Sequence, residues 1–216
     1  MTKLPDAPLV YLITPGELTS DNFKSRRDGL VSAISGAAAD GVNLIQIRER
    51  HLSGRELFEL AKRVVAEVRD TTAKILVSER ADIAAAAGAH GVHLPAAALP
   101  TAAVRAAFGA EFLIGGSAHS ADELRKARSD GADLAVFSPI FDTPGKGPAK
   151  GLNELAAACH AVHGFPVIAL GGIGPANFGP VLDAGAAGVA AIRSLNETFS
   201  RRQIMAGLAP KSRHLR

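Results

Sequence analysis

The feature that most constrains the fold is a weak internal repeat, in which a glycine is followed within a few residues by an apolar run. The repeat occurs as "ADGVNLIQI", "AGAHGVHL", "SDGADLAVF" and "AGAAGVAAI". The segment before each glycine has helical character, and a glycine there suits a left-handed helix cap. The four glycines are Gly41, Gly88, Gly131 and Gly185, which are 47, 43 and 54 residues apart. Each period therefore has room for one strand–helix–strand–helix unit.

Eight short apolar runs fit this arrangement as strands separated by helical segments: "LVYLIT", "NLIQIR", "KILVS", "GVHL", "FLIGGS", "LAVFSPI", "PVIALGG" and "GVAAIRS". Right-handed crossovers would close eight parallel strands into a barrel. An open doubly wound sheet is the alternative, but "LITPGELTS" after the first run is not the Gly-rich fingerprint of that fold. We therefore predict an α/β protein with one (β/α)₈, or TIM, barrel domain over residues 1–216.

Local signals add detail to this fold. Ser53 with Glu56, and Ser120 with Glu123, are spaced as capping boxes, so helices are expected to follow the second and fifth strands. Pro175 is expected at the first position of the helix after the seventh strand.

Composition excludes several classes of protein. Lys and Arg number 24 against 21 Asp and Glu, which is too small an excess to predict nucleic-acid binding. The basic tail, residues 201–216, is expected to be a solvated helix end. No signal-like or membrane-spanning apolar run occurs, and Cys159 is the one cysteine, which excludes an internal disulfide. We expect a cytoplasmic protein, with homo-oligomer formation left open.

In a barrel of this kind, the active site is built at the C-terminal ends of the strands. This rule turns a linear list into a ring of candidate residues. The second and third strands contribute Gln46, Arg48, Arg50, Ser78 and Glu79; the fifth and sixth contribute Ser117, His119, Thr143, Gly145 and Lys146; the seventh and eighth contribute Gly171, Gly172, Ile192 and Arg193.

The period of two places Gln46, Arg48 and Arg50 on one face of a strand. Two interpretations stay open: an anion clamp, since guanidinium binds phosphate bidentately, or a salt-bridge network with Glu49, Glu79 or Asp82. His119 is either a structural histidine or a general acid–base.

The glycines of "ALGGIGPAN" and the loop "FDTPGKGPAKGL" suggest a phosphate held by backbone N–H groups and covered by Thr143 and Lys146. The sequence contains no H-x-x-x-H pair, and "GVHLPAAALP" carries no carboxylate, so we predict no metal ligands.

The ordered motifs "QIRER", "SERADIA", "GVHL", "IGGSAHS", "GADLAVFSPIFDTPGKGPAKGL" and "PVIALGGIGPAN" resemble the family of thiamine phosphate synthase and TenI over nearly the whole chain. The resemblance implies a (β/α)₈ barrel that binds a thiazole phosphate and, in a synthase, also a pyrimidine pyrophosphate, with Mg²⁺ assisting release of pyrophosphate. It assigns Gln46, Arg48, Arg50, Ser117 and Lys146 to the pyrimidine pyrophosphate.

The resemblance assigns Thr143, Gly171, Gly172 and Ile192 to the thiazole phosphate, and His119 to the acid–base of TenI-type tautomerases. Gly145 and Arg193 stand where the synthase has Thr and Ser. Ser78 and Glu79 replace its Asn-Asp, and residues 95–98 replace its Gly-Gln-x-Asp, so the Mg²⁺ carboxylates are largely lost.

These departures favour a TenI-like tautomerase that moves protons on a thiazole phosphate and requires no cofactor. A thiamine phosphate synthase that uses Mg²⁺ is the first alternative. A catalytically silent barrel that binds a metabolite is the second.

Overall fold

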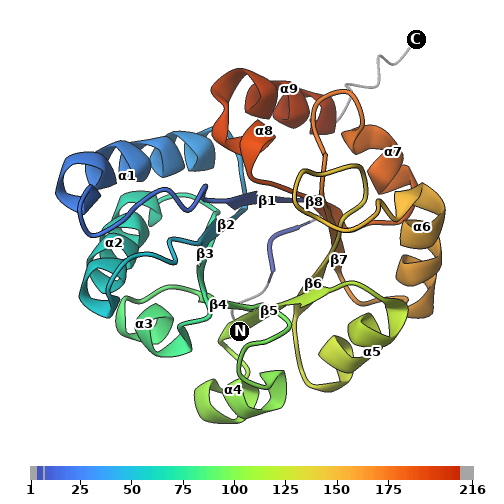
Figure 1. Ribbon diagram of the computed structural model, residues 1–216, viewed down its shortest axis with the longest axis horizontal. Helices are drawn as coiled ribbons and strands as arrows, with labels where there is room; N and C mark the ends of the chain where they lie inside the picture. The colour runs from blue at the N-terminus through green and yellow to red at the C-terminus, as the bar shows by residue number, and fades with distance from the viewer. Residues whose placement is uncertain (1–3, 7, 210–216) are drawn as a thin grey trace.

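The computed structural model describes residues 4–6 and 8–209, and within them the chain forms a closed barrel of parallel strands surrounded by helices (Figure 1). The strands pair in sequence order, and β1 pairs with β8 to close the barrel. The strands are β1 Leu9–Ile13, β2 Leu44–Ile47, β3 Lys74–Ser78, β4 Gly91–Leu94, β5 Leu113–Ala118, β6 Leu134–Phe137, β7 Val167–Leu170 and β8 Gly188–Ala191. The predicted TIM barrel is confirmed.

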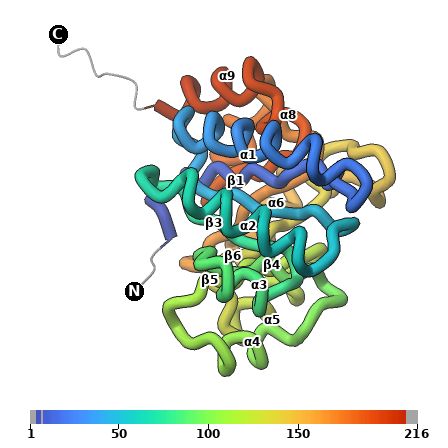
Figure 2. The backbone as a smooth tube through the Cα atoms, turned by 90° about the vertical axis from the view of Figure 1, so that its left-hand side faces the viewer, coloured from blue at the N-terminus to red at the C-terminus, as the bar shows by residue number. Residues whose placement is uncertain are grey.

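The helices alternate with the strands and form the outer wall. Figure 2, seen from the side, shows α1 and α2 lying side by side over the barrel, and the loop after β6 projecting at the right-hand end of the view. The helices are α1 Phe23–Ala39, α2 Gly54–Val68, α3 Ala81–Ala86, α4 Thr101–Phe108, α5 Ala121–Ser129, α6 Gly151–Ala161, α7 Phe178–Asp183, α8 Arg193–Asn196 and α9 Thr198–Leu208.

The four repeat glycines end the helices as predicted. Gly41, Gly88, Gly131 and Gly185 have φ of +99°, +73°, +90° and +94°, and each lies two residues past the end of its helix. After α1, the Gly41 N–H donates to Ala38 O and the Val42 N–H to Ala37 O, which is the Schellman pattern. A glycine is needed because a side chain at such φ is strained.

The other local signals are confirmed in part. Ser53 and Glu56 form a complete capping box on α2. Ser120 caps α5, but the Glu123 carboxylate accepts from the His119 N–H instead of the N–H of Ser120. The prediction for Pro175 is wrong: α7 begins at Phe178, and Asn177, whose side-chain oxygen accepts from the Gly174 N–H, holds an intervening turn.

Two buried apolar clusters arise from the alternation along the strands. The larger one joins the outward side chains of the strands to the inner faces of the helices. The smaller one fills the barrel interior with Leu9, Tyr11, Ile13, Leu44, Leu76, Leu134, Val136, Ile168 and Ala190. The interior is therefore packed, so a ligand has to bind at an end of the barrel.

The basic C-terminal segment is not simply solvated. Arg201 is 4% exposed, and its guanidinium contacts the Asp40 carboxylate at 2.8 Å. This ion pair connects α9 to the C-terminal end of α1. Burial would raise the pKa of Asp40, but hydrogen bonds from Arg201 and Arg202 hold it below its usual value. The rest of the predicted tail, residues 210–216, lies outside the described residues.

No helix within residues 4–6 and 8–209 combines the length and the apolar character that a membrane span requires.

Candidate active site

The parallel strands place their C-terminal ends, and the loops that follow them, at one end of the barrel. The predicted ring residues lie on these ends or loops, except Arg193, which is the first residue of α8. Some of these residues, such as Arg50 and Glu79, contact each other directly. Others lie at the same end of the barrel without a direct contact between them.

The arginines of "QIRER" lie beyond the strand rather than on it. β2 ends at Ile47, so of the three polar residues only Gln46 is within the strand, where it is 2% exposed. Arg48 follows half-buried, and its N–H donates to the Thr14 hydroxyl at 2.8 Å. Burial, and then the charge of Arg50, lower the pKa of Arg48 from its usual value. The prediction of one strand face is corrected: the chain leaves the sheet before Arg48.

The salt-bridge alternative is confirmed for one pair. An Arg50 Nη2 lies 3.1 Å from Glu79 Oε1, and both side chains are nearly half exposed. Asp82 pairs with Arg80 instead, at 2.5 Å. Arg50 is therefore an exposed cation whose carboxylate partner, Glu79, is also nearly half exposed.

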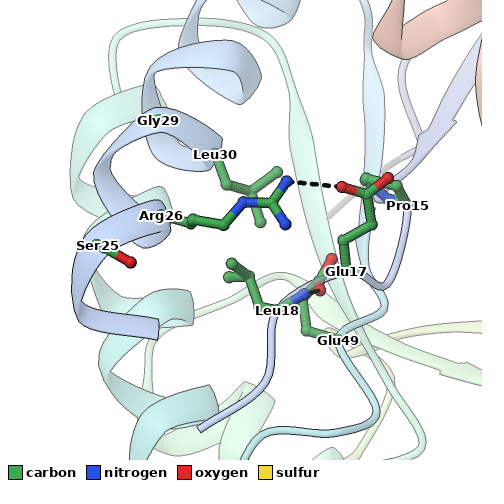
Figure 3. A pocket seen from close by; sticks show the side chains of 8 residues that line it. All are labelled: Pro15, Glu17, Leu18, Ser25, Arg26, Gly29, Leu30 and Glu49. Atoms are coloured by element: carbon green, nitrogen blue, oxygen red, sulfur yellow. Dashed lines mark hydrogen bonds and ion pairs between the residues drawn. The ribbon is translucent and has the colours of Figure 1, made fainter. Parts of the chain in front are cut away.

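Glu49 does not pair with the arginines. It is 2% exposed, and its carboxylate accepts the N–H groups of Gly16 at 3.0 Å and Leu18 at 2.8 Å. A buried carboxylate of this kind fixes the loop that follows β1. Beside it, a cavity of about 350 Å³ lies between this loop and α1, where Arg26 reaches Glu17 at 2.7 Å (Figure 3).

The end of β3 carries two unusual features. Ser78 is 7% exposed, and its Oγ is a buried polar atom without a hydrogen-bond partner among the described residues. Glu79 has φ +65°, a left-handed conformation that is uncommon for a residue with a side chain. Its N–H donates to His93 O at 2.9 Å, which holds this turn against β4. Strained backbone and unpaired polar atoms of this kind gather at functional sites.

A buried polar network that we did not expect connects β1, β4 and β5. His93 is 5% exposed, and its Nε2 lies 3.0 Å from Ser117 Oγ while its Nδ1 lies 3.3 Å from the Tyr11 hydroxyl. Burial, and then the charges of Arg48 and Arg50, lower the pKa of His93 to about 4. The sequence places His93 at the end of the fourth strand, and the alternation within "GVHL" puts it on the inner face. Its contacts with Tyr11 and Ser117 were not predicted.

His119 is exposed at the start of the loop after β5. Its Nδ1 lies 2.9 Å from Ser138 O, so Nδ1 carries a proton and donates it to that carbonyl. A neutral His119 therefore presents a bare Nε2, which can accept a proton.

The loops after β6 and β7 contact each other closely. The Phe141 N–H donates to Gly171 O at 3.1 Å, and the Ile140 N–H donates to Leu170 O at 3.0 Å. Gly171 and Gly172 have φ of +113° and +64°, and a Cβ on either would lie within 3 Å of Pro139 or Phe141. The glycines are thus required by the packing of these loops, and phosphate binding there stays a prediction.

The remaining predicted residues lie farther out on the same end. Thr143 donates its hydroxyl to Phe141 O at 2.9 Å, Gly145 has φ +73° with open space around it, and Lys146 is exposed. After β8, Ile192 and Arg193 are both exposed.

The described side chains at this end form no preassembled Mg²⁺ site. Mg²⁺ binds oxygen ligands, usually one or two carboxylates together with substrate phosphates. Glu79 provides a carboxylate here, but it is paired with Arg50, and the segment after β4 offers alanines and prolines. Among the described residues, no group of three or more His, Cys, Asp or Glu is arranged to hold a metal ion.

Comparison with known proteins identifies the family. Residues 10–195 match the family model described as thiamine monophosphate synthase. A putative thiamine-phosphate synthase of Geobacter sulfurreducens is 38% identical over 211 residues, covering 94% of this chain and 96% of that protein. A thiamine-phosphate synthase of Chlorobium luteolum is 40% identical over 200 residues, covering 91% of this chain and 89% of that protein.

A solved structure agrees with these matches. The thiamine phosphate pyrophosphorylase of Pyrococcus furiosus superposes with a TM-score of 0.76 at 28% identity, covering 91% of each chain. With its closed barrel, its cationic mouth and this similarity along nearly its full length, the chain belongs to the thiamine monophosphate synthase family.

Proposed function

We propose that this chain joins a pyrimidine pyrophosphate to a thiazole phosphate, as a thiamine-phosphate synthase does. In this reaction the bond between the pyrimidine methylene carbon and the pyrophosphate oxygen breaks. A bond from the thiazole nitrogen to that carbon forms, and pyrophosphate leaves. The observation that carries the proposal is the pair Arg48 and Arg50 at the mouth of a barrel that is 38–40% identical to proteins named for this activity.

The two arginines suit the leaving group. A pyrophosphate carries several negative charges, and guanidinium binds such oxygens with two parallel hydrogen bonds. Arg48 is half-buried, so its charge is screened less than that of a surface arginine. Ser117 adds a hydroxyl from the end of β5, and Lys146 adds a cation from the loop after β6. We propose that these groups hold the pyrophosphate as charge develops on it.

The second substrate is proposed to lie against the loops after β6, β7 and β8. Thr143, Gly145, Gly171, Gly172, Ile192 and Arg193 lie on this side of the mouth. We also propose that the chain forms a single barrel domain.

The direct test supplies both substrates and measures thiamine phosphate and pyrophosphate with and without millimolar Mg²⁺. We expect equal amounts of the two products. A requirement for Mg²⁺ would show that the ion takes part in the reaction, and the oxygens of the pyrophosphate would then supply most of its ligands. No product under either condition would overturn the proposal.

One observation favours a second candidate, a tautomerase that moves a proton on a thiazole phosphate. His119 donates from Nδ1 to Ser138 O, which leaves Nε2 free to act as a base. The names of the relatives give this candidate no support, so the preference that the sequence suggested is set second. Conversion of the non-aromatic thiazole phosphate isomer by the wild type, and its loss in His119→Ala, would restore it to first place.

A further inference from the structure

A chain of hydrogen bonds runs from the packed interior of the barrel to its mouth. It begins at the Tyr11 hydroxyl on β1, passes through the His93 ring on β4 and ends at the Ser117 hydroxyl on β5. Tyr11 is 0% exposed and His93 5% exposed, while Ser117 is only half-buried. The two ends of this chain therefore face different surroundings.

The inner end sets the direction of the hydrogen bonds. Burial raises the pKa of Tyr11, so its hydroxyl keeps its proton. A buried hydroxyl whose hydrogen has no acceptor is costly, and His93 Nδ1 is the acceptor within hydrogen-bonding distance among the described residues. Tyr11 therefore donates to Nδ1, which must carry no proton of its own.

The state of the histidine follows from its neighbours. His93 is buried and lies near the positive charges of Arg48 and Arg50, and both effects keep the imidazole neutral. A neutral ring with a bare Nδ1 carries its proton on Nε2. Nε2–H then donates to Ser117 Oγ at 3.0 Å, so the hydrogen of the Ser117 hydroxyl is directed away from the histidine.

The position of the ring is fixed by a glycine on the neighbouring strand. A Cβ added to Gly115 would lie 2.8 Å from His93 Nδ1 and 3.1 Å from Leu134 Cδ1. The Tyr11 and His93 rings pack at 57° with their centroids 5.8 Å apart. The first glycine of "IGGS", Gly115, is thus explained by the space that the His93 ring occupies.

We propose that Tyr11 and His93 are positioning residues that make the Ser117 hydroxyl a dedicated hydrogen-bond donor to an anionic oxygen of the substrate. A hydroxyl that accepts from the histidine keeps its own hydrogen free, and a phosphate oxygen, which only accepts, can take that hydrogen. The inference rests on the proposed function only in naming pyrophosphate as the anion.

The first experiment measures the tautomer directly. Nitrogen NMR of protein labelled with ¹⁵N-histidine, with His93→Gln used for assignment, reports which ring nitrogen carries the proton. We expect a neutral ring protonated on Nε2 at pH 7, and a mixture of tautomers in Tyr11→Phe. A ring protonated on Nδ1, or a charged ring, in the wild type would overturn the proposal.

The second experiment measures calorimetric binding of inorganic pyrophosphate to the wild type, Tyr11→Phe, Ser117→Ala and the double variant. We expect Tyr11→Phe to weaken binding about fivefold to tenfold, and to have no further effect once the Ser117 hydroxyl is absent. Thr71→Val is the matched control, because it removes a hydroxyl that donates to Val68 O before the start of β3, at the opposite end of the barrel.

An equal effect of Tyr11→Phe on affinity with and without the Ser117 hydroxyl would mean that Tyr11 does not act through Ser117. Absence of pyrophosphate binding in the wild type would contradict the proposal that Ser117 donates to this anion. Neither measurement requires turnover, so failure of the synthase assay would leave the tautomer result standing. The two proposals can thus fail separately.

Discussion

The two halves of the barrel mouth are built differently. Along β2 to β5, the inner positions nearest the mouth carry polar side chains: Gln46, Ser78, His93 and Ser117. Along β6 to β8, the inner positions are apolar, with Val136, Ile168 and Ala190, and the polar groups nearest the mouth belong to the backbone of the glycine-containing loops. The first half therefore offers a ligand side chains from the strands, and the second half offers main-chain N–H groups together with the exposed side chains of Lys146 and Arg193.

This difference has a consequence for mutations. An exposed or half-buried side chain can be replaced without moving the chain, so substitutions of Arg48, Arg50 or Ser117 are expected to change binding or catalysis and leave stability nearly unchanged. A backbone group is held in place by packing, so substitutions in the loops after β6 and β7 are expected to change stability first.

The largest effect is expected from Arg48→Gln. The variant loses a half-buried cation at the mouth, and we expect kcat/KM for pyrophosphate release to fall about 100-fold with an unchanged melting temperature. Arg80→Gln is the control, since Arg80 follows the next strand but pairs with Asp82. A fall in kcat/KM of less than about threefold in Arg48→Gln would mean that the pyrophosphate does not bind at Arg48.

An intermediate effect is expected from the backbone half. Gly171→Ala puts a Cβ 2.9 Å from Pro139 Cα at φ +113°, and we expect it to lower the free energy of unfolding by about 3 kcal/mol. Gly145→Ala has a similar positive φ of +73° but open space around it, so about 1 kcal/mol is expected. Urea unfolding of both variants measures the difference, and equal losses would show that φ alone, and not the close approach of the loops, requires the glycine.

The smallest effect is expected from Glu79→Gln, which removes the carboxylate paired with Arg50. Exposed ion pairs contribute about 0.5 kcal/mol, so affinity for inorganic pyrophosphate without Mg²⁺ is expected to rise about twofold as Arg50 is released. Asp82→Asn removes the matching carboxylate from Arg80 and should leave affinity unchanged. A large loss of Mg²⁺-dependent activity in Glu79→Gln would instead make this carboxylate a ligand of the ion.

Much of the site could be predicted because a barrel of parallel strands gathers all its strand ends in one place. That rule placed Glu79, Ser117 and His119 at the mouth, and the structure has them at or just beyond the ends of β3 and β5. Their roles stay predictions. The pairing of Arg50 with Glu79 was one of two open alternatives, and the sequence could not choose between them because both use the same residue types.

Other features depended on contacts between distant segments. Tyr11 and His93 are 82 residues apart, and neither had a local sign of its partner. Glu49 was grouped with the arginines, but its carboxylate binds the loop after β1. Arg201 was assigned to a solvated tail. Its contact with Asp40, 161 residues away in sequence, depends on how α9 packs on α1, and no local pattern indicates that packing.

The sequence by itself determined the repeat, the strands, the glycine caps and the order of elements, because these follow from periodicity and backbone conformation within a few residues. Only the tertiary structure decided which polar groups meet. Hydrogen bonds and ion pairs act over about 3 Å, and closure of the barrel brings such groups together across β1, β4 and β5. The direction in which the Ser117 hydroxyl points therefore belongs to the fold and not to any local motif.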